Sequence, residues 1–343
     1  MRRYWGGVSL VLVAVLALLA AGCGGGGGGG GGGESTSASG GGKKIKVCLI
    51  TDIGGLNDRS FNFLANKGLQ DAKSQLGVET RVIQSQQNSD YIPNLQTCGQ
   101  AGYDLIISVG FLMGDATHKA AQAFPKSNFA IIDFAYSPDQ ALKNLQGLVF
   151  QEEQPGYLAV YLAGLTTKTN VVSSVGGQKI PPVDHYIAGY EAGAKDANPN
   201  VKTIHGYSQS FTDQAACKEI ALDQISKKSD IVFQVAGQCG LGALDAAKEK
   251  GVWGIGVDAD QAYLGPHILT SALKRVDVAV FKTIQATQDG KFKGGGVTVF
   301  NLSNDGVGLG KTSSKVPQDV LDKLKAQQDK VKNGDVKVPN TVK

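Results

Sequence analysis

The chain has 343 residues, 42% of them hydrophobic and 19% charged, with a formal net charge of +4 at pH 7. Its lysines are scattered and form no basic stripe with interleaved aromatic residues, so a nucleic-acid partner is not expected. The roughly 300 residues that follow a biased N-terminal segment exceed the usual size of one hydrophobic core, which predicts two domains.

The N-terminal residues have the pattern of an export signal. Arg2 and Arg3 are basic, residues 8–21 form an uncharged apolar run, and small residues precede Cys23. The run is shorter than the ~20 residues that span a bilayer, so residues 1–22 are predicted to be a signal peptide. Small residues before a cysteine resemble the lipoprotein processing site, which would leave Cys23 lipidated. A plain cleaved signal is the alternative, because Ala20 stands where such sites prefer leucine.

Residues 23–42 are rich in glycine and serine, with an unbroken glycine run at residues 24–33. Such a segment has no apolar surface to bury and is predicted to be a flexible tether. Behind a lipidated Cys23 it would keep the folded part at a membrane surface.

Apolar runs alternate with stretches of helical periodicity from Ile45 onward. Strands are predicted at residues 45–50, 80–84, 105–109, 129–132, 145–150, 171–175, 203–207, 231–235, 254–257, 269–273 and 297–300. Helices are predicted from Phe61 and at residues 94–100, 116–124, 156–165, 187–196, 213–227, 241–250 and 317–332. The alternation implies an α/β fold with parallel sheets and helices on both faces.

Polar residues and a proline at residues 151–155 follow a strand and mark the expected break between two domains. We expect two doubly wound, Rossmann-like lobes with a hinge and a central cleft. The N-terminal lobe is expected at residues 43–150 with part of residues 265–295. The C-terminal lobe is expected at residues 151–264 with residues 296–343, since late strand-like segments suggest repeated crossing between lobes.

The turn from Asp52 to Asn62 is dense in ligand-type side chains. It joins the first predicted strand to a helix at the strand's carboxyl end, where open parallel sheets bind ligands. Ser60 is placed to cap that helix. An ordinary capped turn is the alternative reading, although such a turn needs neither two aspartates nor an exposed Phe61.

Polar and aromatic residues also follow later strands. They include the loop that ends at Asp115, residues 208–213 with Phe211, the pair Gly237-Gln238, and Asp258. Carboxyl ends of parallel strands gather at one sheet edge, so these loops are expected to face one cleft. Phe61 and Phe211 could hold a flat ligand between their rings. Ordinary core packing is the alternative for each phenylalanine.

Signatures of enzymes and cofactor sites are incomplete. The sequence Gly310-Lys311-Thr312 ends like a phosphate-binding loop, but Asp305 stands where that loop needs glycine. Residues 206–210 lack the last glycine of a nucleophile elbow. The four histidines are far apart, with no pair at metal-ligand spacing. No catalytic residue, metal or cofactor is therefore predicted.

Four cysteines follow Cys23, namely Cys48, Cys98, Cys217 and Cys239. An even number in an exported protein suggests disulfides, for which three connectivities exist. The pairs Cys48–Cys98 and Cys217–Cys239 are expected because each would lie within one lobe. Four buried thiols are the alternative.

Several motifs in the same order resemble the basic membrane protein family of bacterial lipoproteins. They lie at residues 52–62, 110–116, 180–183, 189–193, 210–213 and 251–258. The resemblance implies a type I periplasmic-binding-protein fold and a substrate-binding component of an ABC transporter. The better understood members bind purine nucleosides. Ser60 and the Gln238-Cys239 pair depart from the residues that members often carry.

The resemblance also implies roles for individual residues. Phe61 and Phe211 would sandwich the base, and Asp115 would read its edge with Ser60 or Asn62. A carboxylate there accepts purine N–H groups, which favours guanosine, inosine or adenosine. Asp258 would accept hydrogen bonds from the ribose hydroxyls, and Lys274 would donate a hydrogen bond to the sugar. Gly237 would let the backbone approach the ligand closely, and Asp52 would order the first turn.

The sequence thus predicts a monomeric, lipid-anchored, extracytoplasmic receptor that passes a purine nucleoside to an ABC permease with a separate ATPase subunit. One alternative is a binding protein for a sugar or a signalling molecule. Another is a nucleoside hydrolase that uses Asp52, Asp58 and Asp115 as a metal cluster.

Overall fold

The computed structural model describes residues 44–342, which form two six-stranded sheets. The predicted signal peptide, the tether and Cys23 lie outside the described residues. The first sheet is parallel and has the strand order β11 (Val297–Phe300), β5 (Leu145–Phe150), β4 (Asn128–Ile132), β3 (Leu105–Val109), β1 (Lys46–Thr51), β2 (Glu79–Gln84). The second has the order β12 (Val307–Leu309), β10 (Ile268–Lys274), β9 (Trp253–Asp258), β8 (Ile231–Val235), β6 (Val171–Gly176), β7 (Lys202–Tyr207). Only β12 in this part of the chain pairs antiparallel.

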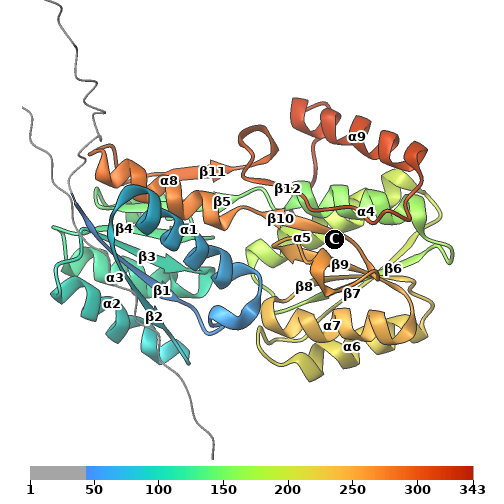
Figure 1. The fold of residues 1–343 in the computed structure, drawn as a ribbon, viewed down its shortest axis with the longest axis horizontal. Helices are drawn as coiled ribbons and strands as arrows, with labels where there is room; N and C mark the ends of the chain where they lie inside the picture. The colour runs from blue at the N-terminus through green and yellow to red at the C-terminus, as the bar shows by residue number, and fades with distance from the viewer. Residues whose placement is uncertain (1–43, 343) are drawn as a thin grey trace, which may run out of the picture. The chain divides into compact units, whose positions relative to one another are not determined.

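Helices cover both sheets (Figure 1). The first lobe carries α1 (Phe61–Leu76), α2 (Tyr91–Gln100), α3 (Gly114–Ala123) and α8 (Val276–Gln288), and α8 packs beside α1. The second lobe carries α4 (Glu153–Thr166), α5 (Pro181–Ala197), α6 (Gln214–Ser226), α7 (Gly237–Lys250) and the terminal α9 (Gln318–Asn333). The predicted α/β fold with two lobes is confirmed.

Strand burial follows position in the sheet. β3 reads LIISV, lies inside the first sheet and is buried along its whole length, as suits a strand covered on both faces. β2 lies at the edge and alternates between exposed and partly buried residues. β12 was not predicted, because three residues in a glycine-rich stretch carry no readable period.

Two late strands exchange the lobes that the sequence suggested for them. β10 was expected with the N-terminal lobe but pairs with β9 in the second sheet. β11 was expected with the C-terminal lobe but pairs with β5 in the first sheet. The alternation of apolar residues identifies a strand but not the strand that it pairs with, because that partner is set by where the folded chain places the segment. The described chain therefore crosses between the sheets three times.

The helices α4 and α5 of the second lobe pack very closely against each other. A Cβ on Gly189 of α5 would lie 2.1 Å from the carbonyl oxygen of Glu153 at the start of α4. Only glycine permits this approach. The close packing brings the first turn of α5 next to the crossing between β5 and α4, where the two lobes meet.

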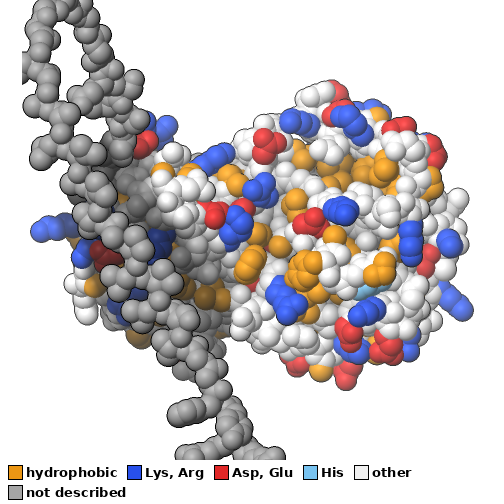
Figure 2. All heavy atoms as spheres, viewed as in Figure 1, with side chains coloured by type: hydrophobic (Ala, Val, Ile, Leu, Met, Phe, Trp, Pro, Cys, Tyr) orange, Lys and Arg blue, Asp and Glu red, His pale blue; other side chains and the backbone are white. Residues whose placement is uncertain are grey.

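No helix within residues 44–342 is both long and apolar enough to cross a membrane. On the face shown in Figure 2, acidic and basic side chains are interspersed and no single-sign stripe is visible.

Candidate functional site

A pocket lies between the lobes, at the carboxyl ends of strands from both sheets. Its empty space is about 600 Å³, counting the part open to solvent. Seven of the nine predicted ligand-binding residues line it: Asp52, Phe61, Asn62, Phe211, Gly237, Asp258 and Lys274.

Ser60 and Asp115 are the two predicted residues that do not line the pocket. Asp115 lies in the first turn of α3 and is exposed. Phe111 and Leu112, earlier in the same loop, line the pocket instead. Ser60 is fully buried. The sequence placed both residues in the right loops, but the 3-10 turn before α3 and the first turn of α1 direct them elsewhere.

Asp52 organises the turn that follows β1. Its Oδ1 accepts hydrogen bonds from the Gly54 backbone N–H at 2.9 Å and from Asn62 Nδ2 at 2.8 Å. Burial raises the pKa of Asp52 to about 6, although both hydrogen bonds act to lower it. The Asn62 amide is thereby oriented, and its Oδ1 is buried without a hydrogen bond from the described residues.

The cap of α1 differs from the predicted one. Ser60 occupies the N-cap position, but its side chain makes no capping hydrogen bond. The Asp58 carboxylate caps the helix instead, accepting from the backbone N–H groups of Ser60 at 3.0 Å, Asn62 at 2.7 Å and Phe63 at 3.1 Å. A carboxylate has two oxygens to satisfy several of the free N–H groups of a first turn, and a hydroxyl has one. Asp58 also lines the pocket.

Lys274, the last residue of β10, is buried among carboxylates. Its Nζ lies 2.6 Å from Asp133 Oδ2 and 3.0 Å from Glu152 Oε1. It also lies 5.0 Å from the ring centroid of Phe61, within the range of a cation–π contact. Burial alone would lower the pKa of Lys274, but the neighbouring carboxylates outweigh it and hold that pKa above its usual value. The ammonium is charged, and two of its three N–H groups are engaged.

Asp133 and Asp258 occupy equivalent places in the two lobes. Asp133 directly follows β4 and Asp258 ends β9, and each of these strands is third from its sheet's late-strand edge. Both have left-handed backbone conformations, with φ of 71° and 61°. Burial raises the pKa of each to about 7, against the opposing effect of the Lys274 charge. Tyr186 Oη donates to Asp258 Oδ1 at 3.4 Å, and Asp133 Oδ1 accepts no hydrogen bond from the described residues.

Asp133 was not among the predicted residues, although it follows a strand end as Asp258 does. Both aspartates come at the carboxyl end of a buried apolar strand. Tyr186 was not predicted, because in the sequence it has the spacing of an ordinary core residue of a helix. It reaches the pocket through the packing of α5 against α4. Apolar residues complete the second lobe's wall: Ile180, Pro182, Val183, Val235 and Val257.

The Phe211 ring packs against the backbone of the second lobe. A Cβ on Gly177 would come within 2.4 Å of the ring, so this position requires glycine. Gly237 has φ of 55°, a conformation that glycine adopts without strain. Phe211 and Gly237 line the pocket together, as predicted, with Gln238 beside them.

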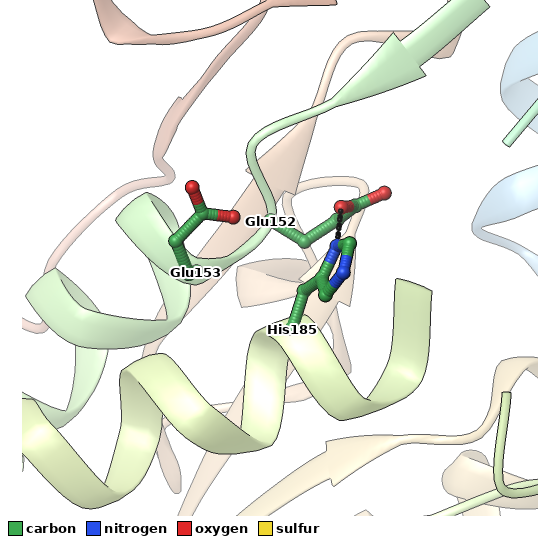
Figure 3. Close-up of side chains that lie close together, drawn as sticks. All are labelled: Glu152, Glu153 and His185. Carbon is green, nitrogen blue, oxygen red and sulfur yellow. Dashed lines mark hydrogen bonds and ion pairs between the residues drawn. The ribbon is translucent and has the colours of Figure 1, made fainter. Parts of the chain in front are cut away.

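Figure 3 shows a group of possible metal ligands at the crossing between lobes, formed by Glu152, Glu153 and His185. Both Glu152 oxygens are already engaged, Oε2 with His185 Nδ1 at 3.0 Å and Oε1 with Lys274 at 3.0 Å. Burial would raise the pKa of Glu152, but Lys274 and His185 outweigh it and hold the pKa below its usual value. The group is thus a hydrogen-bonded ion cluster. Asp52, Asp58 and Asp115, the metal cluster of the hydrolase alternative, form no such group among residues 44–342.

The structure joins the cysteines in the two expected pairs. Cys48 and Cys98 link β1 to α2 with Cα atoms 6.2 Å apart, and Cys217 and Cys239 link α6 to α7 with Cα atoms 5.6 Å apart. Each disulfide is buried inside its own lobe, Cys48–Cys98 in the first and Cys217–Cys239 in the second.

Residues 45–342 match the family described as "ABC transporter substrate-binding protein PnrA-like", or Bmp. The chain belongs to this family. It is 36% identical over 318 residues to the "ABC transporter nucleoside-binding protein BmpA" of Lactococcus lactis, covering 86% of this chain and 89% of the relative. It is 34% identical over 299 residues to "Basic membrane protein A" of Borreliella burgdorferi, covering 86% and 88%. The resemblance stated from the motifs is therefore confirmed.

Solved structures agree with this placement of the Bmp chain. An ABC transporter solute-binding protein from Aeropyrum pernix superposes with a TM-score of 0.79 at 26% identity, covering 86% of this chain and 94% of that one. A glucose-galactose binding protein from Geobacillus stearothermophilus shares only the fold, with a TM-score of 0.59 at 16% identity over 80% of this chain and all of that one. The Bmp family is one of substrate-binding proteins, and the chain is an ABC transporter substrate-binding protein.

Proposed function

We propose that this protein is a lipid-anchored, extracytoplasmic receptor that captures a purine nucleoside between its lobes and delivers it to an ABC permease. The observation that carries the proposal is the pocket composition. Phe61 from one lobe and Phe211 from the other line it, together with buried carboxylates from both lobes. The relative from Lactococcus lactis, named as nucleoside-binding, supports the same ligand class.

The base would stack between Phe61 and Phe211. An aromatic pair contributes about 0.5 to 1.5 kcal/mol beyond the burial of its area. The edge of the base would meet Asn62, whose Oδ1 is a buried acceptor with its amide held by Asp52. An acceptor at this place favours a base that presents N–H groups, as guanine, hypoxanthine and adenine do. In this proposal Asn62, and not Asp115, reads the base edge.

The sugar would bind the charged side of the pocket. Asp258 and Asp133 offer acceptor oxygens to ribose hydroxyls, and the third N–H of Lys274 could donate to a sugar oxygen. A buried acceptor without a hydrogen-bond partner lowers the stability of the protein. A ribose hydroxyl that donates to Asp133 Oδ1 would therefore contribute more binding free energy than the same hydrogen bond contributes in water. The proposal therefore assigns recognition of the riboside to this cluster.

Ligand binding would stabilise the closed arrangement of the lobes, because only that arrangement brings residues of both lobes onto one ligand. The permease would recognise the closed monomer. Energy for transport would come from a separate ATPase subunit. The protein would stay at the extracytoplasmic surface through lipid on Cys23, with residues 23–42 as the tether. Binding without conversion fits a site whose carboxylates accept hydrogen bonds from the Asn62 amide, from the first turn of α1 and from Lys274.

A thermal-shift screen tests the ligand class. Residues 43–343 would be heated with inosine, guanosine, adenosine, their free bases, ribose and glucose. A ligand that binds only the folded state raises the unfolding temperature by mass action. The proposal expects a clear rise with purine nucleosides and little with bases or ribose alone. A rise with sugars only would replace the nucleoside by a sugar, and free ribose released from inosine with calcium present would indicate a hydrolase.

A further inference from the structure

We propose that the Cys217–Cys239 disulfide is a positioning element of the ligand pocket, because it fixes the wall formed by Phe211. The proposal rests on the nucleoside site proposed above, and adds to it a structural role for this covalent bond. Figure 1 shows α6 and α7 side by side, and the bond joins their first turns.

Both ends of this disulfide lie next to pocket residues. Cys239 directly follows Gly237 and Gln238, which line the pocket at the start of α7. Cys217 lies in the first turns of α6, just after the loop that carries Phe211. The two cysteines are fully buried. The bond therefore ties the pocket-lining start of α7 to the start of α6, 22 positions away along the chain.

Cys239 holds Phe211 directly through the backbone. The Cys239 N–H donates to the Phe211 carbonyl oxygen at 3.0 Å. The N–H groups of Ser208 and Gln209 also anchor this loop, through hydrogen bonds to the end of β6. Ser210 Oγ accepts from the N–H groups of Thr212 and Asp213, and Asp213 caps α6. At Phe211 itself, the long-range backbone hydrogen bond that the structure gives comes from Cys239.

The rest of the contact between α6 and α7 does not depend on the bond. A Cβ on Gly242 would lie 1.9 Å from the Gln214 carbonyl oxygen, so the two helices touch along their backbones one turn further on. Apolar side chains such as Ala243 and Ala221 pack around the two sulfurs. Alanine in place of both cysteines should therefore leave the helices packed while freeing the first turn of α7.

The chain contains a matched control. Cys48–Cys98 is also buried and also links two elements within one lobe. No residue within three positions of Cys48 or Cys98 lines the pocket. Removing it changes the stability of the protein without touching the wall at Phe211.

The experiment compares C217A/C239A with C48A/C98A, using residues 43–343, since residues 42–343 form a compact unit. Inosine affinity is measured by calorimetric titration well below the unfolding temperature. We expect C217A/C239A to weaken binding about fivefold or more, within the range that aromatic stacking contributes. C48A/C98A should change it less than about twofold. Equal losses in the two variants, or no loss in C217A/C239A, would overturn the proposal.

A double-mutant cycle tests whether the bond acts through Phe211. Adding C217A/C239A to Phe211→Ala should cost little further affinity, because the wall that the bond positions is already gone. A further loss as large as in the wild-type background would show that the bond acts by another route. If C217A/C239A does not fold, C217V/C239A keeps more of the buried volume filled and takes its place.

Hydrogen exchange gives a measurement that does not depend on the ligand. Peptides that cover residues 208–216 and 237–241 should exchange faster in C217A/C239A than in C48A/C98A. Unchanged protection of these peptides would overturn the positioning role whatever the ligand is. If exchange changes as expected while the wild-type protein binds no nucleoside, the proposed function fails and the positioning role stands.

Discussion

Replacement of Lys274 by methionine tests the charged cluster at the junction of the lobes. The Lys274 side chain is 2% exposed, and its partners Asp133 and Glu152 are 5% and 2% exposed. Methionine keeps most of the side-chain volume and removes the ammonium. The two carboxylates then stay buried beside each other, with only His185 left as a partner of Glu152.

Removal of one partner from a buried ion pair costs about 3 to 5 kcal/mol, because an uncompensated charge remains in the interior. We expect a loss of this order in the free energy of unfolding at pH 7.5. The loss should shrink at pH 5.5. Asp133 already has a pKa of about 7 with the ammonium present, and without it the carboxyl takes up a proton more readily.

Urea unfolding at the two pH values measures the effect, with circular dichroism and tryptophan fluorescence followed together to check that the transitions coincide. Lys218→Met is the matched control, since Lys218 also contacts two acids, Asp245 at 2.6 Å and Glu249 at 3.2 Å, but on the surface. It should change stability little. A Lys274→Met loss below about 1 kcal/mol, or one that is the same at both pH values, would refute the charged buried cluster.

Four further predictions follow from the site. Phe211→Ala should weaken inosine binding by more than about 1 kcal/mol in calorimetric titration, because one stacking face is lost; unchanged affinity with an intact circular dichroism spectrum would remove Phe211 from the base. Asp258→Ala should weaken the binding of inosine more than that of hypoxanthine, and equal losses would separate Asp258 from the ribose. Asp58→Ala should lower the free energy of unfolding by about 1 to 2 kcal/mol as a lost helix cap, and Ser60→Ala by less; the reverse order would restore Ser60 as the cap. The unliganded protein should lose stability as pH rises from about 4 to 7, because Asp133, with a pKa raised to about 7 in the folded protein, binds its proton more tightly there than in the unfolded chain; stability that rises over this range at constant ionic strength would contradict that raised pKa.

Local sequence predicted the elements of the fold well. Residues 105–109, 145–150, 231–235 and 297–300 were predicted as strands with the bounds that the structure has. Each is a short apolar run bounded by polar or turn residues, so the signal lies within the segment itself. The sequence did not predict which strands pair with one another. β10 and β11 lie in the lobes opposite to those predicted, because the residues within a strand do not specify its neighbours in the sheet.

The candidate site divides in the same way. Asp52 lines the pocket because it follows the end of β1 directly, whereas Phe61 and Asn62 reach the pocket from the first turn of α1. Asp115 lies in the first turn of α3, after the 3-10 turn that follows β3, and there it is exposed to solvent. Asp133 could have been predicted from its place at the end of a buried strand, as Asp258 was. Tyr186 could not, because it lies within a helix that has ordinary core spacing.

The sequence by itself determined which segments become strands and helices and which loops follow strand ends, because each depends on patterns a few residues long. The tertiary structure decided that Asp58 and not Ser60 caps α1, that Asp133 and Asp258 take equivalent places, and that Lys274 lies between Asp133 and Glu152. These features join residues more than a hundred positions apart or compete for the same N–H groups. Only the packed chain, with its distances and its desolvated charges, selects among them.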